Sequence, residues 1–145
     1  MKLPLKPTEV LRDTAVRAAL TTAWIESVPG ATGGHEEDGF VVLGPDEKLA
    51  MRRWPTGGGN QIQVPPHTGC EVDGRPIVAS FHTHPNTGPD FLQEPSETDK
   101  RGVREDVELK GKWYVGEFVV SDETVFLLTP AGAVRELGSR AELLG

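Results

Sequence analysis

Apolar residues near the start of the chain follow the period of a helix. In residues 8–28, Val16, Leu20 and Trp24 recur at every fourth position, which places them on one side of a helix. Thr8 has the side chain of a capping residue and can cap the first turn. The pattern predicts one amphipathic helix over residues 8–28, with its apolar side in the core.

Short apolar runs bounded by turn residues then predict a series of strands. The runs occupy residues 39–43, 49–54, 60–64, 76–84, 113–120, 124–128 and 133–137. Two further helices are predicted, a weak one over residues 96–109 and a short one over 139–144. The glycine-rich segment 55–60 lacks the closing Lys and Ser/Thr of a phosphate-binding loop, so we interpret it as a turn. These elements predict a mixed α/β fold with one sheet flanked by helices.

The strongest strand signal in the chain is PIVASFHTH, residues 76–84. Side chains of a strand alternate between its two faces. The expected faces are Val78, Ser80, His82 and His84 on one side, and Ile77, Ala79 and Phe81 on the other. Pro85 has no N–H and therefore ends the hydrogen-bond ladder. Two histidines on one face can bind the same metal ion, although an isolated pair more often consists of two solvated side chains.

A second local pattern marks the start of the weak helix. Ser96-Glu97-Thr98-Asp99 combines a capping serine with an acid at the third helical position, which is the arrangement of a capping box. By itself this pattern indicates only a helix N-terminus. Because such a terminus is rigid, it also gives Ser96 and Asp99 fixed directions, so capping and metal binding do not exclude each other.

Composition and charge restrict the class of protein. A chain of 145 residues suits one compact domain, and we expect residues 1–145 to form it. The single cysteine, Cys70, excludes a disulfide framework and a four-cysteine zinc site. With 22 acidic and 15 basic residues, the formal net charge of −7 disfavours nucleic acid as a partner.

The first ten residues, MKLPLKPTEV, contain no long apolar run. They resemble neither a signal peptide nor a membrane span, so no membrane association is expected and the cytoplasm is the expected location. A protein exported without a cleaved signal would have the same features.

Several zinc enzymes carry a His-x-His pair, and most do not fit this chain. Metallo-β-lactamases continue the pair as H-x-H-x-D-H, whereas here Pro-Asn-Thr follows. Amidohydrolases need a barrel of about 250 residues. Zinc deaminases carry H-x-E instead, which His35-Glu36-Glu37 matches, but they also need a P-C-x-x-C segment, which one cysteine cannot supply.

The run H-T-H-P at residues 82–85, the S-x-x-D at 96–99 and the upstream E-x-x-G at 36–39 together resemble the JAMM (JAB or MPN-plus) metalloproteases. The resemblance implies a mixed sheet between helices in a three-layer, cytidine-deaminase-like architecture. It also implies a catalytic zinc with water as its fourth ligand. The implied zinc ligands are His82, His84 and Asp99, with Glu36 as general base and Ser96 as oxyanion donor.

One spacing departs from the family pattern. Eleven residues separate His84 from Ser96, which is longer than usual in the family. Asp90 and Glu94 in this loop are therefore alternative ligands. Glu37 is the alternative to Glu36 as base.

The implied activity is that of a zinc-dependent isopeptidase or peptidase. It would hydrolyse amide bonds in a protein or peptide, including those after the C-terminal tail of a ubiquitin-like protein. Two alternatives stay open: a peptidase effector or toxin domain, and a non-catalytic zinc-binding interaction module. Phe91 and Leu92 flank the expected site and either contact the substrate or tuck into the loop. A Cys70–His67 nucleophile pair is disfavoured because no third group is evident to orient it.

Overall fold

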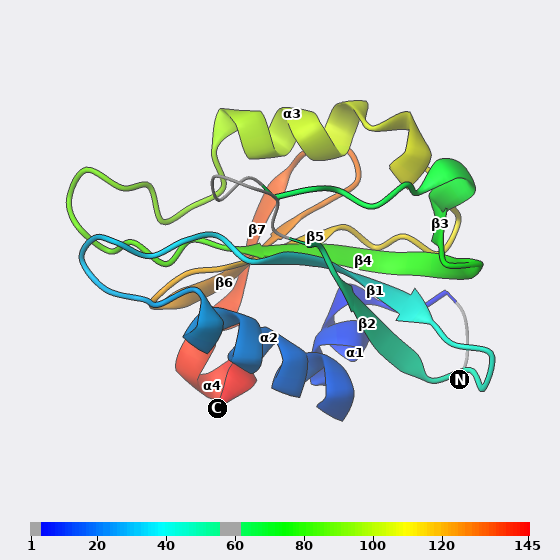
Figure 1. The fold of residues 1–145 in the computed structure, drawn as a ribbon, viewed down its shortest axis with the longest axis horizontal. Helices are drawn as coiled ribbons and strands as arrows, with labels where there is room; N and C mark the ends of the chain where they lie inside the picture. Colours follow the sequence, from blue (N-terminus) through cyan, green and yellow to red (C-terminus); the bar gives the residue numbers. More distant parts are fainter. Residues whose placement is uncertain (1–3, 56–61) are drawn as a thin grey trace.

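The computed structural model describes residues 4–55 and 62–145 (Figure 1). Its elements in chain order are α1 (Pro7–Arg12), α2 (Thr14–Glu26), β1 (Asp38–Leu43), β2 (Leu49–Arg53), η2 (Thr68–Cys70), β3 (Glu71–Val72), β4 (Arg75–Thr83), α3 (Glu97–Glu105), η3 (Val107–Leu109), β5 (Glu117–Val120), β6 (Thr124–Leu128), β7 (Val134–Ser139) and α4 (Arg140–Leu144). Within the described ranges, no helix combines the length and hydrophobicity that a membrane crossing requires.

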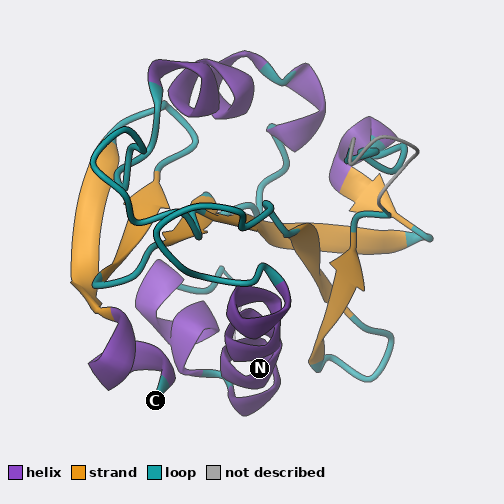
Figure 2. Cartoon of the chain, turned by 60° about the vertical axis from the view of Figure 1, so that its left-hand side comes forward, coloured by secondary structure: helices purple, strands orange, loops and turns teal. Residues whose placement is uncertain are grey.

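The strands form one mixed sheet in the order β2-β1-β4-β5-β6-β7, with the short β3 paired to β4. The β4–β5 pair is parallel, and the other pairs are antiparallel. Helix α3 lies over one face of the sheet, while α1, α2 and α4 lie under the other (Figures 1 and 2). The predicted mixed α/β fold with flanking helices is confirmed.

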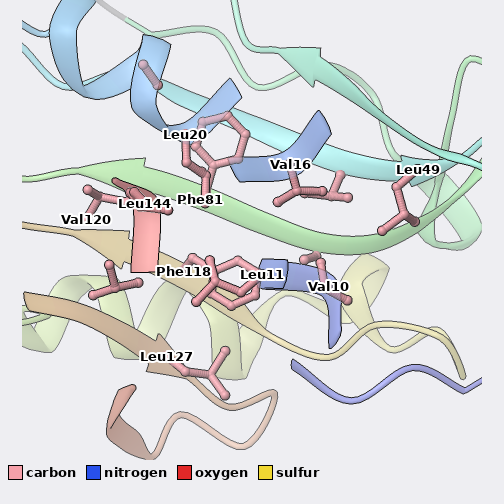
Figure 3. Close-up of a cluster of buried hydrophobic side chains, with 14 of the residues drawn as sticks. Val10, Leu11, Val16, Leu20, Leu49, Phe81, Phe118, Val120, Leu127 and Leu144 are labelled. Carbon is pink, nitrogen blue, oxygen red and sulfur yellow. The ribbon is translucent and has the colours of Figure 1, made fainter. Parts of the chain in front are cut away.

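Two hydrophobic clusters cover the two faces of the sheet. The larger one lies between the sheet and helices α1, α2 and α4, and contains Leu20, Phe81 and Phe118 (Figure 3). The smaller one lies on the α3 side, where Ile77 packs in a cluster with Val103 of α3. Strand β4 is therefore buried on both faces, which explains why it appears in the sequence as a continuous apolar run.

The N-terminal helix predicted over residues 8–28 is two helices. Asp13 interrupts it, because its carboxylate accepts hydrogen bonds from the N–H groups of Ala15 (2.9 Å) and Val16 (3.1 Å) and caps α2. The N-cap of α1 is Lys6, so the predicted cap at Thr8 is wrong. The predicted core positions Val16, Leu20 and Trp24 are all buried.

The predicted faces of β4 hold only for its second half. Val41 of β1 pairs with Ala79, and Val42 pairs with Ile77, so Val78 forms a bulge. The bulge reverses the alternation below it: Val78 packs with the α2-side cluster and Ile77 with the α3-side cluster, opposite to the prediction. Above the bulge, Phe81 faces α2, while His82 points toward α3 as predicted.

Other element boundaries differ from the predictions where the backbone turns. The strand predicted over 113–120 begins only at Glu117, because Gly116 has φ +129° and interrupts an extended run. The helix predicted over 96–109 ends at Glu105, and η3 follows. Of the strand predicted over 60–64, residues 60 and 61 lie outside the described residues, and Ile62 forms only a single bridge. Residues 56–60 of the predicted glycine-rich turn also lie outside them.

Candidate metal centre

Three predicted residues converge on one point above the end of β4. Nε2 of His82 lies 3.1 Å from Nε2 of His84. Oδ2 of Asp99 lies 3.3 Å from the first of these nitrogens and 3.2 Å from the second. Strand β4 and the residue after it supply the two imidazoles, and the first turn of α3 supplies the carboxylate. The structure thus brings together His82, His84 and Asp99.

The triangle has the dimensions of a tetrahedral metal site. Zinc–nitrogen and zinc–oxygen bonds of about 2.0–2.1 Å at tetrahedral angles place neighbouring ligand atoms about 3.3 Å apart. The measured separations of 3.1–3.3 Å match this value. Two imidazoles and one carboxylate are also ligands that zinc commonly takes. The three residues therefore fit a zinc ion and leave a fourth position open.

The outer nitrogens of both histidines have partners that fix the rings. Nδ1–H of His82 donates to Oε2 of Glu117 over 2.8 Å, and Nδ1–H of His84 donates to the carbonyl oxygen of Gln93 over 3.2 Å. A carbonyl oxygen can only accept, so the His84 proton sits on Nδ1. The Nε2 lone pair then points at the centre, as metal-binding histidines require.

The sequence prediction did not include these two supporting groups. Glu117 has a sequence signal, since it is a single charged residue within the apolar run WYVGEFVV, and it is buried in the structure. The contribution of Gln93 comes from its backbone, so no side-chain pattern could have indicated it.

The predicted capping box at the start of α3 is confirmed. The N–H of Ser96 donates to Oδ2 of Asp99 over 2.8 Å, and the N–H of Asp99 donates to Oγ of Ser96 over 3.0 Å. The same Oδ2 faces the histidines, so the cap and the candidate metal site share one atom. Because Oγ of Ser96 acts as acceptor in the cap, its hydroxyl hydrogen remains free to donate elsewhere.

Charges around the centre favour a cation there. Burial opposes the ionised form of Asp99, but hydrogen bonds that His82 and His84 donate from Nε2 in their protonated forms outweigh it and hold the pKa of this carboxyl well below its usual range. Burial likewise opposes the charged form of His82, yet the charge of Glu117 and the hydrogen bond to Asp99 raise its pKa well above the ordinary value. The surroundings thus stabilise a positive charge at this point, whether it is a proton or a metal ion.

Glu36 and Asp38 form a carboxyl pair beside the triangle. Their oxygens and a ring nitrogen of His82 all lie within 4.8 Å of one another. Glu36 is exposed in the loop before β1, whereas Asp38 is 7% exposed. Burial, and then the nearby charge of Glu36, raises the pKa of Asp38 to about 9. The sequence prediction included Glu36 but not Asp38.

The alternative residues lie elsewhere. Glu37 forms ion pairs with Arg53 and, at 2.9 Å, with His35. Neither Asp90 nor Glu94 belongs to any group of three potential ligand residues in the described part of the chain. Both of these loop acids are exposed.

Two hollows meet at Glu36. A cleft of about 240 Å³ runs between β1, α3 and η3, and Asp38, His82 and Asp99 contribute to its lining. A second hollow of about 280 Å³ lies on the other side, lined by Glu36, His84, Pro85, Asn86, Phe91 and Leu92. Phe91 and Leu92 are 41% and 51% exposed, so they line this hollow rather than tuck into the loop.

The loop that carries Glu36 is tied to the loop that follows His84. The N–H of Gly30 donates to the carbonyl of Pro85 over 3.2 Å, and the N–H of Thr87 donates back to Gly30 over 2.8 Å. The Asn86 side chain accepts from the N–H of Gly34 over 2.7 Å. These hydrogen bonds hold the loop that leads to Glu36 against the residues that follow His84 at the end of β4.

The Cys70–His67 pair is not set up as a nucleophile. The Cys70 thiol is buried 3.8 Å from the carbonyl oxygen of Ile77, and burial raises its pKa. Both ring nitrogens of His67 are engaged, one by the Pro65 carbonyl at 2.9 Å and the other by Asp106 at 2.7 Å.

Comparison with models of known protein families finds no match for this chain, and comparison with curated proteins finds none either. The chemistry of the site therefore has to be argued from its own residues.

Proposed function

We propose that the protein is a zinc-dependent peptidase or isopeptidase with a JAMM-like, three-layer architecture. One observation carries the proposal: Nε2 of His82, Nε2 of His84 and Oδ2 of Asp99 lie 3.1–3.3 Å apart, at tetrahedral zinc spacing. The buried Glu117 and the carbonyl of Gln93 support it, because both hold the imidazoles in the tautomer that binds metal.

Zinc bound by these three ligands would supply a nucleophilic hydroxide at neutral pH and polarise the scissile carbonyl. The remaining steps belong to side chains of the chain. Glu36 takes a proton from water and delivers it to the leaving amine, which is the work of a general base that then acts as an acid. Its exposed position at the rim of the cleft, beside His82, suits this transfer.

Ser96 has the second role. In an amide hydrolysis the carbonyl oxygen gains negative charge, and a fixed donor stabilises that charge by about 2.7–4 kcal/mol in other hydrolases. The Ser96 hydroxyl keeps its hydrogen free and is held in place by the cap of α3. It is the donor in this proposal.

The substrate in this proposal is a protein or peptide, including the C-terminal tail of a ubiquitin-like protein. An extended tail can bind along an edge strand of a sheet. Strand β2 is at one edge of the sheet, and the hollow lined by Phe91 and Leu92 lies beside Glu36. Both features offer contacts to an extended chain that passes the site.

The test combines metal content with hydrolysis. Elemental analysis of the purified protein should find about one zinc per chain, and His82→Ala or His84→Ala should remove it. His67→Ala is the matched control and should keep the zinc. Cleavage is then measured on a panel of ubiquitin-like precursors with short C-terminal extensions, with and without a chelator.

Absence of zinc from wild type after incubation with zinc would overturn the metal site. Zinc without cleavage of any peptide, precursor or conjugate would favour a non-catalytic zinc-binding module instead. Cleavage that the chelator abolishes and zinc restores is the expected result.

A further inference from the structure

The hollow that Glu36 and His84 share with the candidate metal centre is uncharged beyond these two residues. Its volume is about 280 Å³, and its other lining residues are Pro85, Asn86, Phe91 and Leu92. None of these four has an ionisable side chain. A charged group that entered would lose part of its hydration and find no partner outside the centre itself. The hollow therefore favours an uncharged, apolar occupant.

Phe91 and Leu92 expose large apolar surface to this hollow. They are adjacent in the chain and 41% and 51% exposed. Other exposed apolar side chains of the described residues, such as Ile25 on α2 and Val134 on β7, do not line it. Single exposed apolar residues are ordinary on a protein surface, whereas neighbouring ones beside a hollow are typical of a binding groove.

Hydrogen bonds fix the backbone that carries these side chains. The N–H of Phe91 donates to the carbonyl oxygen of Gly88 over 3.1 Å, and the N–H of Gly88 donates to that of Ala31 over 2.9 Å. The side-chain amide of Gln93 donates to the carbonyl oxygens of Asn86 (2.6 Å) and Phe91 (3.3 Å). The walls of the hollow are therefore formed before a ligand arrives, so binding requires little ordering of the loop.

The position of the hollow restricts what can occupy it. Because Glu36 and His84 belong to both the hollow and the centre, an amide bond placed at the centre brings its neighbouring residues to the mouth of the hollow. Successive residues of an extended chain lie about 3.3 Å apart, so only residues close to that bond reach it. Its volume is just below the range of about 300–1,000 Å³ for pockets that take drug-sized ligands, which suits one side chain.

We infer that this hollow is a specificity subsite for one large apolar side chain of the peptide substrate, namely leucine, methionine or phenylalanine, within two residues of the amide that is cleaved. The inference rests on the proposed peptidase function and adds a substrate preference to it. Phe91 and Leu92 are the specificity-determining residues, because their side chains bury the apolar side chain of the substrate.

The experiment uses zinc-loaded wild-type protein and sets of peptides that differ at one position. Leucine, phenylalanine, alanine and glutamate are placed in turn at each of the two positions on either side of the scissile bond. Competition within one reaction gives ratios of kcat/KM. Leucine should exceed alanine by about tenfold at one of these positions, since an open hollow buries only part of the added side chain. Glutamate should be no better than alanine there.

Two variants connect this preference with the hollow. Phe91→Ala and Leu92→Ala should each reduce the leucine-to-alanine ratio by about threefold or more, because they remove apolar surface that the leucine covers. Ile25→Ala is the matched control and should leave the ratio unchanged, because Ile25 is an exposed apolar residue that lines neither hollow at Glu36. The zinc content of each variant is measured alongside and should equal that of wild type.

Equal kcat/KM for leucine and alanine at every position would overturn the inference while leaving the peptidase function standing. A preference for leucine that persists in both Phe91→Ala and Leu92→Ala would also overturn it, because the subsite would then lie elsewhere. Dimerisation of wild type in analytical ultracentrifugation that Phe91→Ala abolishes would assign the hollow to a second copy of the chain instead.

If no peptide is cleaved, binding of the same labelled peptides to the zinc-loaded protein, measured by fluorescence anisotropy, is decisive. Tighter binding of the leucine peptide than of the alanine peptide, lost in Phe91→Ala, supports the apolar subsite even though the peptidase proposal fails. Equal binding of the two peptides overturns it.

Discussion

Glu117 and His82 lie on adjacent parallel strands, β5 and β4, and Oε2 of Glu117 is 2.8 Å from Nδ1 of His82. Both side chains are buried, so this hydrogen bond is shielded from solvent. It fixes the imidazole ring whose Nε2 faces Asp99. A carboxylate behind a metal-binding histidine orients the ring and raises its basicity.

Glu117→Gln should therefore weaken zinc binding by about tenfold or more, because the amide keeps a hydrogen-bond acceptor but loses the charge. Zinc affinity is measured by competition with a chelating dye. Glu123→Gln, an exposed acid between β5 and β6, is the control. Equal affinity of wild type and Glu117→Gln would show that this hydrogen bond does not act on the metal.

Glu36→Gln should abolish hydrolysis while the zinc content and the fold are retained. Glutamine keeps the shape and can hydrogen-bond water, but it cannot accept the proton, and loss of a general base costs about 10²–10⁴-fold in rate. Glu37→Gln should change activity little, since Glu37 is engaged with Arg53 and His35. The measurements are kcat/KM and elemental analysis of each variant. If Glu37→Gln is inactive and Glu36→Gln is active, the general base is Glu37 rather than Glu36.

Two deletions in the long loop after His84 should have different effects on the metal. The carbonyl of Gln93 accepts from Nδ1–H of His84 and also from the hydroxyl of Ser121. Deleting residues 87–90 keeps this carbonyl and should spare most of the zinc, whereas deleting residues 92–95 should lose it. Zinc content and the unfolding midpoint are measured for both. Full zinc retention by the second deletion would contradict the role of Gln93.

The His67–Asp106 pair should make stability depend on pH. Burial opposes the charged imidazole, but the hydrogen bond to Asp106, the Pro65 carbonyl and the charges of Asp106 and Glu108 outweigh it and raise the pKa of His67. Because the pKa of His67 is higher in the folded state than the value of about 6.5 in the unfolded state, the folded state is stabilised at pH values below 6.5. This contribution disappears as the pH rises through the folded pKa. His67→Gln should therefore have a lower free energy of unfolding than wild type, and this difference should shrink by up to about 1 kcal/mol between pH ~5.5 and pH ~8.5. Urea unfolding at both pH values measures it, and a deficit that grows with pH would contradict the assignment.

Gly39 is expected to resist substitution because of its contact with Phe81. A Cβ at residue 39 would lie 2.5 Å from Cζ of Phe81 and 3.1 Å from the carbonyl oxygen of Arg52. Gly39→Ala should destabilise the protein by about 1–3 kcal/mol through overpacking. Phe81→Leu relieves this contact, so the double variant should lose less than the sum of the two single losses. Urea unfolding of all four proteins measures the cycle, and strict additivity would contradict the steric explanation.

Sequence patterns were sufficient to predict those features that depend only on residues close together in the chain. The capping box of Ser96 and Asp99 involves residues three apart, and the strand that carries His82 has its own apolar run. The predicted faces of β4 failed below Val78, since the bulge arises from pairing with β1 and has no signal within β4 itself. The break at Asp13 is also local, since aspartate is a favoured N-cap, but the prediction of one helix over residues 8–28 missed this signal.

The sequence by itself determined the mixed α/β class, the buried stripe of α2 and the capping box of Ser96 and Asp99, while the candidate set His82, His84, Asp99 and Glu36 came from the resemblance of its motifs to a known family. Periodicity and capping act between neighbours in the chain, so they are visible without a fold. Only the tertiary structure decided which groups support those residues. Glu117 reaches His82 through the parallel pairing of β4 with β5. Asp106 lines the same cleft as Glu36 because α3 and η3 pack against the sheet next to β1, with the cleft between them. Contacts of this kind depend on how distant segments pack, and packing is a property of the whole chain rather than of any single stretch.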